Sequence, residues 1–546
     1  VGRYKGTLRN LVVVEANPEV LYAAFQNIDL SPFLRTQTTF FLMSPSTQEV
    51  RDFMNQHLTP FSVDGLEIVD HPASTELDAP FYENVKQVVH ESLQSGEILL
   101  RTKIQIGGLI QENVIRNLPE LLNNPTVSAL QGLFHGIPAF IVGAGPSLDR
   151  NIDALQQVGD QGVIIAVDTV FSLLLEKGIR PHIVVSTDPT QMNARHFENI
   201  TDLGETALVF SPSLYHEILP QLQGSKISIP LTTSRFLQTL RDVLGETGDM
   251  SPGINVGQTC FNLGRYMGCN PLVLVGMDFS FPIQGGHTHV SGAAWRRPIE
   301  TTSRQETMRV ELIGSDQQWE EFDPIMVPGN QEPQVATSKF WLAYLRTMEQ
   351  EARHTQAQVI NATEGGARIE GAETAPLQEV IAQYCQRDAM ISSTLQMSVG
   401  FFFGANSEAG ANVLNEAAEI LRIADEKADE GIEQVNKLEK VIQSPEPNPE
   451  LIRSLIQDIR KTHQALIQNH KFYLVLDEAA DRLLADFVKR EGRPEGDNPS
   501  AENAQQTAQR FGAYFAQAKQ LSVAYKKVIQ ETQEKLQNLD FGFPSF

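Results

Sequence analysis

Short apolar runs alternate with helical spacings in the first part of the chain. A β-branched run at residues 11–15 precedes a helical stretch near 18–26, and residues 39–43 predict a second strand. This pattern indicates a small α/β domain over residues 1–80. Apolar positions between 81 and 122 recur at helical spacing, so we expect helices that lead into the next part of the chain.

The pattern changes after about residue 137, where near-continuous apolar runs end in turn residues and are separated by helical segments. Strands that are apolar on both faces are typical of a parallel sheet covered by helices. The sequence therefore predicts a doubly wound, Rossmann-like α/β domain over residues 81–392. Its strands are expected at residues 139–142, 163–167, 183–186, 207–210, 272–275 and 359–361.

The last part of the chain is rich in Ala, Glu, Gln, Lys and Leu at helical spacing. Pro-rich breaks at 444–449 and 492–499 fit turns between antiparallel helices. We therefore predict a C-terminal helical bundle over residues 393–546. Its three long helices are expected at residues 408–442, 450–489 and 503–539.

Composition narrows the class of protein. The 546 residues carry a formal net charge of −24, which argues against nucleic acid or an anionic membrane as the main partner. The three cysteines, Cys260, Cys269 and Cys385, show no CxxC spacing, so a disulfide framework or a Cys-based metal site is not supported. The chain has no apolar run of about 18 residues and no secretory signal pattern, so we expect a cytoplasmic protein without a membrane span.

The strongest local feature is a glycine-rich turn after the first central strand. Gly143, Gly145, Pro146, Ser147 and Leu148 lead from this strand into a helix that begins with proline. Glycines let the backbone approach a ligand, and exposed N–H groups at a helix start favour a phosphate. The turn matches neither the dinucleotide-binding nor the phosphate-loop motif. It indicates a nucleotide or phosphate site, and the alternative is a tight strand-to-helix turn.

Polar residues also end the next two strands. Asp168 follows Gly145 by about 20 residues, where an acidic side chain binds ribose hydroxyls in mononucleotide-binding folds. The alternative is that Asp168 caps the helix beginning near Thr169, and one residue can do both. Ser186, Thr187 and Asp188 place two hydroxyls and a carboxylate at the same edge of the sheet. For each of these residues, helix capping is the alternative role.

Three further turns carry candidate residues. Gly276 and Asp278 follow the strand at 272–275, and a metal at Asp188 would need Asp278 as its second carboxylate. His287 and His289 lie in the long polar loop that follows; a histidine there can act as general base, and the alternative is two solvated surface side chains. The turn after residue 361 closes the pocket or caps a helix. Its candidate residues are Asn361, Thr363 and Glu364.

Six segments of this part of the chain form a recognisable set: GAGPSLD at 143–149, IAVDT at 165–169, STDP at 186–189, VGMDFS at 275–280, THVSG at 288–292 and INATEGGARIEG at 360–371. Together these segments resemble the bacterial motility-associated factor proteins, which are flagellin glycosyltransferases. The same core occurs in archaeal-type 6-hydroxymethyl-dihydropterin pyrophosphokinases, and the GPSL turn is similar to that of bacterial sialyltransferases.

The resemblance implies transfer of a nonulosonic acid, such as pseudaminic or legionaminic acid, from its CMP donor to Ser or Thr hydroxyls of flagellin. The turn at 143–147 would hold the CMP phosphate, and Asp168 with residues 186–188 the ribose or base. His289, which falls in the family's Thr-His pattern, would take the acceptor proton, so His289 and Asp278 are the catalytic candidates. No metal or cofactor is expected besides the CMP-sugar, and a homo-oligomer is compatible with the sequence.

Two other functions remain open. The shared core also fits an ATP-dependent pyrophosphokinase acting on a hydroxymethylpterin-like substrate, which would need Mg²⁺. A non-catalytic flagellin-binding chaperone is the third class. A pterin kinase has no protein acceptor and no evident use for three long helices. A flagellin-modifying enzyme must bind a helical protein, and the C-terminal bundle could provide the surface for it.

Overall fold

The computed structural model describes most of the chain. The described residues are 11–29, 31, 39–56, 66–230, 234–245, 247–282, 285–294, 296–301, 307–311, 318–400, 407–477, 479–480, 483, 487 and 501–537. Contacts divide the chain into two compact units, one of Val1–Gly107 with Ala480–Gly496 and one of Gly108–Ala479 with Asp497–Phe546. The domain boundaries expected after residues 80 and 392 stay predictions.

The first unit contains the small α/β arrangement expected from the sequence. Strands β1 (Leu11–Glu15) and β2 (Thr39–Met43) pair in parallel, and α1 (Pro18–Asn27) connects them, so these three predicted elements are confirmed. Helix α1 begins with proline behind Asn17, whose side chain accepts a hydrogen bond from the Glu19 N–H. The unit also contains α3 (Thr47–Gln56), α5 (Pro72–Leu77) and the larger part of α6 (Ala79–Arg116).

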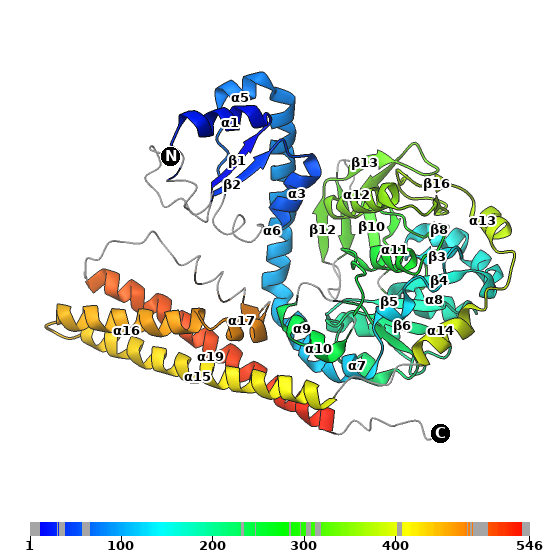
Figure 1. Cartoon of the computed structure of the whole chain (residues 1–546). Helices are drawn as coiled ribbons and strands as arrows, with labels where there is room; N and C mark the ends of the chain where they lie inside the picture. Colours follow the sequence, from blue (N-terminus) through cyan, green and yellow to red (C-terminus); the bar gives the residue numbers. More distant parts are fainter. Residues whose placement is uncertain are drawn as a thin grey trace. The chain divides into compact units, whose positions relative to one another are not determined.

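The second unit is built on an eight-stranded parallel sheet of order β16-β15-β8-β3-β4-β5-β6-β7 (Figure 1). The six predicted strands are confirmed at the expected residues, whereas β7 and β16 were missed because runs of three and two residues carry little periodicity. The strands are β3 (Ala139–Val142), β4 (Val163–Val167), β5 (Ile183–Ser186), β6 (Ala207–Phe210), β7 (Lys226–Ser228), β8 (Leu272–Val275), β15 (Val359–Asn361) and β16 (Glu373–Thr374).

Helices complete the doubly wound architecture. Helix α11 (Val256–Tyr266) packs on β3, β4, β5 and β8, and the apolar strands and the helices around them form one continuous core. Several crossovers are 3₁₀ helices, where the sequence suggested α-helices. The 3₁₀ elements are η1 (Val127–Leu130), η2 (Pro146–Arg150), η3 (Ile152–Gln157), η4 (Gly159–Gln161), η5 (Asp168–Val170), η6 (Gln191–Phe197) and η7 (Leu219–Gln221). The other α-helices are α7 (Leu118–Asn123), α8 (Phe171–Glu176), α9 (Arg235–Thr239), α10 (Arg241–Leu244), α12 (Lys339–His354), α13 (Leu377–Tyr384) and α14 (Ile391–Gly400).

An antiparallel insertion, which the sequence did not predict, separates β8 from α12. Four strands form a sheet of order β12-β11-β10-β9, and two more form a hairpin. Phe281, Ile299 and Met308 make its separate small core with Ala336. The strands are β9 (Gly286–His287), β10 (Pro298–Thr301), β11 (Met308–Glu311), β12 (Trp319–Phe322), β13 (Ile325–Pro328) and β14 (Gln334–Thr337).

The C-terminal bundle consists of α15 (Ser407–Ile442), α16 (Pro449–Ile467), α17 (His470–Leu476) and α19 (Ala501–Gln537) (Figure 1). The turn at 444–449 is confirmed, and the turn at 492–499 lies outside the described residues. The expectation of one helix over 450–489 is wrong, because Asn469 caps a new helix by accepting a hydrogen bond from Phe472 N–H. Asp477 ends that helix at a φ of +42° and accepts a hydrogen bond from the Arg235 side chain.

The long helices are amphipathic, with one apolar face that packs inside the protein. Helices α6, α15 and α19 contain 38, 36 and 37 residues, so length alone would let each cross a membrane. Within the described residues, however, no helix combines this length with enough apolar character to span one.

The bundle predicts one stability effect. In the contact between α15 and α19, a Cβ on Gly431 would lie 2.5 Å from the ring of Phe515, which is fully buried. We expect Gly431→Ala to lower the thermal unfolding midpoint, because overpacking costs about 1–3 kcal/mol and exceeds the gain in helix propensity. Gly400→Ala is the matched control, since nothing lies within 4 Å of its new methyl group. Equal midpoints for the two variants, measured by circular dichroism, would contradict this packing.

Candidate active site

The polar turns of the central domain gather where the parallel strands end, and we call this part of the sheet the carboxyl edge. Strand β3 lies where the strand order reverses: β4 to β7 follow on one side, and β8 and β15 lie on the other. In open α/β sheets, ligands bind outside the carboxyl ends of the strands at such a point. The turns after β3 and β8 are therefore at the centre of the candidate site.

The turn after β3 packs directly on the turn after β8. Gly143 N–H donates to the carbonyl oxygen of Val275, and Gly145 N–H donates to that of Gly276, both at 2.8 Å. A Cβ on Gly143 would lie 2.6 Å from the Gly276 oxygen, and one on Gly145 would overlap the carboxylate of Asp278. Both glycines are thus required by the close approach of two backbone turns.

Asp278 binds the start of η2 and joins the two turns. Its carboxylate accepts hydrogen bonds from Ser147 N–H at 3.0 Å and from Ser147 Oγ at 2.6 Å. The side chain is 4% exposed, and this burial raises its pKa to about 6, while the hydrogen bonds from Ser147 limit the rise.

The expectation of exposed N–H groups in this turn is wrong for Gly143, Gly145 and Ser147. Their N–H groups donate to two carbonyls and a carboxylate of the protein itself. Pro146 begins η2 as expected, and Leu148 is fully buried in the core. A donor-binding role for these residues stays a prediction, and it would have to use atoms other than these three N–H groups.

Asp168 forms a buried hydrogen-bond network between the ends of β4 and β5. Its Oδ2 accepts from Ser186 Oγ at 2.7 Å, Ser186 Oγ accepts from Asn193 Nδ2 at 2.8 Å, and its Oδ1 accepts from Thr169 N–H at 2.8 Å. Burial raises the pKa of Asp168 and lowers the pKa of nearby His196, so both groups are shifted toward their neutral forms. The network adds a role for Asp168 that neither ribose binding nor helix capping covers.

Thr187 and Asp188 lie half-buried just beyond this network. Asp188 Oδ1 accepts a hydrogen bond from Thr190 N–H at 2.7 Å, a local turn like the capping alternative. Its pairing with Asp278 around a metal does not fit the structure. Two strands separate β5 from β8, which puts the two strand ends about 14 Å apart. Among the described residues, no group of three His, Cys, Asp or Glu side chains is arranged to hold a metal.

The histidine loop docks onto the glycine turn. Val290 N–H donates to the Ala144 oxygen at 2.9 Å, and Ser291 Oγ donates to Asp149 at 2.9 Å. These bonds bring His289, which the loop carries, next to the turn after β3. Its Nδ1 lies 2.8 Å from Thr288 Oγ1.

Two further contacts describe the surroundings of this loop. The ring of His289 faces Trp341, the third residue of α12, at a centroid distance of 6.5 Å. His287 belongs to β9, where burial and the charge of Arg296 lower its pKa.

The turn after β15 reinforces the same centre. Thr363 Oγ1 accepts from Met277 N–H at 3.1 Å, and Asn361 Oδ1 accepts from Thr363 N–H at 3.0 Å. Glu364 accepts from Leu377 N–H at 3.2 Å and so caps α13, which agrees with the capping alternative. Thr363 thus supports the turn that carries Asp278.

Sequence reasoning missed Asn113 and Asn117, which lie one turn apart near the end of α6. Asn113 Nδ2 donates to the oxygens of Pro189 and Ser213, and Asn117 Nδ2 donates to those of Pro212 and Leu214. Both side chains are at most 1% exposed. Their spacing of four residues in a helix with a largely apolar buried face was a signal that could have identified them.

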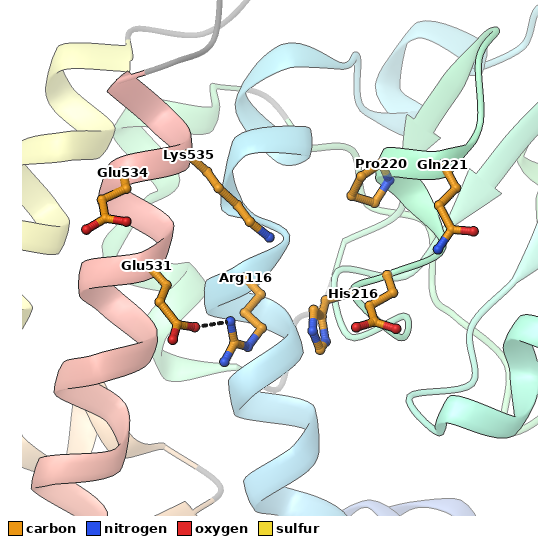
Figure 2. Close-up of a pocket in the computed structure, with 8 residues that line it drawn as sticks. Arg116, His216, Pro220, Gln221, Glu531, Glu534 and Lys535 are labelled. Carbon is orange, nitrogen blue, oxygen red and sulfur yellow. Dashed lines mark hydrogen bonds and ion pairs between the residues drawn. The ribbon is translucent and has the colours of Figure 1, made fainter.

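The described pockets lie away from the predicted residues. One groove of about 700 Å³ is lined by Arg116, His216, Glu217, Pro220, Gln221, Glu531, Glu534 and Lys535 (Figure 2). A second, of about 580 Å³, lies on α6 in the first unit around Glu83, Lys86 and His90. Neither is lined by a residue proposed from the sequence.

Comparisons with known proteins find similarity over part of the chain. Residues 112–284 match a family described as 6-hydroxymethylpterin diphosphokinase MptE-like. The chain is 27% identical over 177 residues to 6-hydroxymethyl-7,8-dihydropterin pyrophosphokinase of Methanocaldococcus jannaschii. The aligned region covers 31% of this chain and 70% of that protein.

A solved structure shares the fold over nearly the whole chain. It is the MAf glycosyltransferase from Magnetospirillum magneticum AMB-1, with a TM-score of 0.54 at 14% identity over 97% of this chain and 77% of that one. These findings support the resemblance to motility-associated factor proteins and to pterin pyrophosphokinases, and they show the predicted α/β fold with its helical C-terminal region.

The buried carboxyl of Asp278 predicts a pH dependence of stability. Because its pKa rises from 3.8 to about 6 on folding, it contributes stability that is complete below pH 3.8 and is lost as pH rises through 6. Between pH 4 and 7, the unfolding free energy of the wild type should therefore fall by about 2.4 kcal/mol relative to that of Asp278→Asn. Urea unfolding at several pH values measures it, and a constant difference would contradict the assignment.

Proposed function

We propose that this chain is a glycosyltransferase that moves a nonulosonic acid from its CMP donor to Ser or Thr hydroxyls of flagellin. The observation that carries the proposal is the extent of the two similarities. The match to the pterin pyrophosphokinase family covers residues 112–284, whereas the fold of the MAf glycosyltransferase covers 97% of the chain, including the bundle. Helices added beside a transferase core provide further surface, and this supports a protein acceptor over one as small as a pterin.

Donor binding is proposed at the carboxyl edge. Thr187 and Asp188 are half-buried polar residues that directly follow Ser186 of the Asp168–Ser186 network, and they would bind the ribose or base of CMP. The network itself would hold their backbone in place, since its members are buried and bonded to one another. Buried, satisfied polar groups of this kind keep a site rigid.

His289 is the proposed general base. If its Nδ1–H donates to Thr288 Oγ1, its Nε2 carries the lone pair that takes the acceptor proton. The acceptor oxygen then forms a bond to the anomeric carbon, the bond from that carbon to the phosphate oxygen breaks, and CMP leaves with the electron pair.

The pyrophosphokinase family match favours a second candidate function, transfer of diphosphate from ATP to a hydroxymethylpterin. That reaction uses Mg²⁺. The described carboxylates do not fit a magnesium site, because Asp278 is engaged by Ser147 and Asp188 lies about 14 Å away along the sheet.

Thermal unfolding with ligands separates the candidates. We expect CMP or a CMP-activated nonulosonic acid at about 100 times its Kd to stabilise the chain by about 2.7 kcal/mol, and ATP with Mg²⁺ to have little effect. Asp188→Ala should reduce this stabilisation, whereas Asp153→Ala, which removes an exposed carboxylate on η3, should retain it. A shift with ATP alone would favour the pyrophosphokinase, and no shift with any nucleotide would favour a flagellin-binding chaperone.

A second experiment tests the base. His289→Ala should lower kcat for transfer to flagellin by about 10²–10⁴-fold, because no base is left to take the proton of the flagellin hydroxyl. His287→Ala is the control, since His287 lies in β9 of the same loop region and is also half-buried. The rate of sugar transfer is measured by mass spectrometry of flagellin. A larger loss of rate in His287→Ala than in His289→Ala would assign the role of base to His287.

A further inference from the structure

The groove beside the bundle lies within the second unit and is built from three separate elements. Arg116 comes from the last turn of α6, His216 and Gln221 from the segment after β6, and Lys535 from α19. Figure 2 shows Lys535 extending from α19 toward α6, with Arg116 between Glu531 and His216. A groove of about 700 Å³ falls in the range of functional binding sites.

This groove is connected to the carboxyl edge of the sheet. The segment 211–216 follows β6 directly, and Tyr215 N–H donates to the oxygen of Asp188 at 3.3 Å. Asn113 Nδ2 donates to Pro189 O at 2.9 Å and to Ser213 O at 3.0 Å. The groove therefore begins next to the turn that we propose for the donor.

Asn113 also fixes the tautomer of His216. Because the amide nitrogen of Asn113 donates to two carbonyls, its Oδ1 is the atom that faces His216 and accepts from His216 N–H. His216 Nδ1 lies 2.9 Å from the same oxygen and must donate to it. Nε2 then carries the lone pair of the neutral ring and can accept a hydrogen bond from a hydroxyl.

Burial and nearby cations shift His216 toward its neutral form. Burial and the charges of Arg116 and Lys535 lower its pKa, against the opposing charges of Glu112 and Glu217. Arg116 is held at 2.7 Å by Glu112 and at 2.6 Å by Glu531. The side chain of Lys535, in contrast, is exposed, and its charge acts on Glu531 and His216 without a hydrogen bond or ion pair among the described residues.

The composition of the lining favours a polypeptide. Cations, carboxylates, an amide and an imidazole line the groove, and they can bond the N–H, carbonyl and hydroxyl groups of an extended segment. The wall that α19 contributes also lies outside residues 112–284, the range that matches the pterin diphosphokinase-like family. The groove is thus completed by a helix that lies outside the match to that family.

We propose that this groove binds the hydroxyl-bearing polypeptide segment of the acceptor, with His216 Nε2 accepting a hydrogen bond from a Ser or Thr hydroxyl other than the one that His289 deprotonates, and Lys535 binding a backbone carbonyl or a carboxylate. This inference rests on the proposed function and names its acceptor site. Asn113 is the positioning residue that holds His216 and the donor turn together.

The test uses the full chain with unglycosylated flagellin and a CMP-activated nonulosonic acid. His216→Ala and Lys535→Ala should each raise the KM for flagellin about tenfold, more than they change the KM for the donor. Lys535 is exposed, so its variant is expected to fold even if His216→Ala does not. Lys526→Ala is the matched control, because Lys526 lies nine residues earlier on α19, on the opposite face of the helix, and does not line the groove.

Direct binding of flagellin to each variant keeps the two proposals distinguishable. If the wild type transfers sugar and the groove variants match the control, the groove proposal is overturned and the proposed function stands. If these variants weaken CMP binding instead, the groove belongs to the donor and the acceptor assignment is overturned. If the wild type binds flagellin but transfers no sugar, and both groove variants bind flagellin more weakly than the wild type, the groove proposal stands and the proposed function fails.

Discussion

The carboxylate of Asp278 joins the turn after β3 to the turn after β8 where the strand order of the sheet reverses. It can reach Ser147 because Gly143 and Gly145 leave no side chain between two backbones in contact. Burying this carboxyl raises its pKa to about 6, so its burial costs stability at neutral pH, and the hydrogen bonds from Ser147 offset part of that cost. A buried carboxyl with a shifted pKa at the switch point of an α/β sheet is typical of a functional centre.

Other polar contacts extend from this centre along the carboxyl edge. The Asp168–Ser186–Asn193 network fixes the end of β5, and Asn113 connects the following turn to the segment after β6. Each of these side chains is buried and donates or accepts within the protein, so the edge is rigid without any ligand. The candidate donor turn and the groove beside α19 are therefore held in one fixed arrangement.

The core alone is compatible with two transfer chemistries. Residues 112–284 match a family described as 6-hydroxymethylpterin diphosphokinase MptE-like, and α19, outside this range, adds a charged wall to the groove near Arg116 and His216. Under the proposed function, this wall would give a polypeptide acceptor a longer surface of hydrogen-bonding groups.

The sequence by itself determined the six main strands, the α/β class and the helical C-terminal region, because apolar periodicity is a local property that a short window reveals. It placed the candidate residues at strand ends for the same reason. The tertiary structure alone decided that Ser147 N–H binds Asp278 and that Asn113 positions His216. These outcomes depend on which groups, often more than 100 residues apart, meet in the fold and satisfy one another's hydrogen bonds, and no local pattern contains that information.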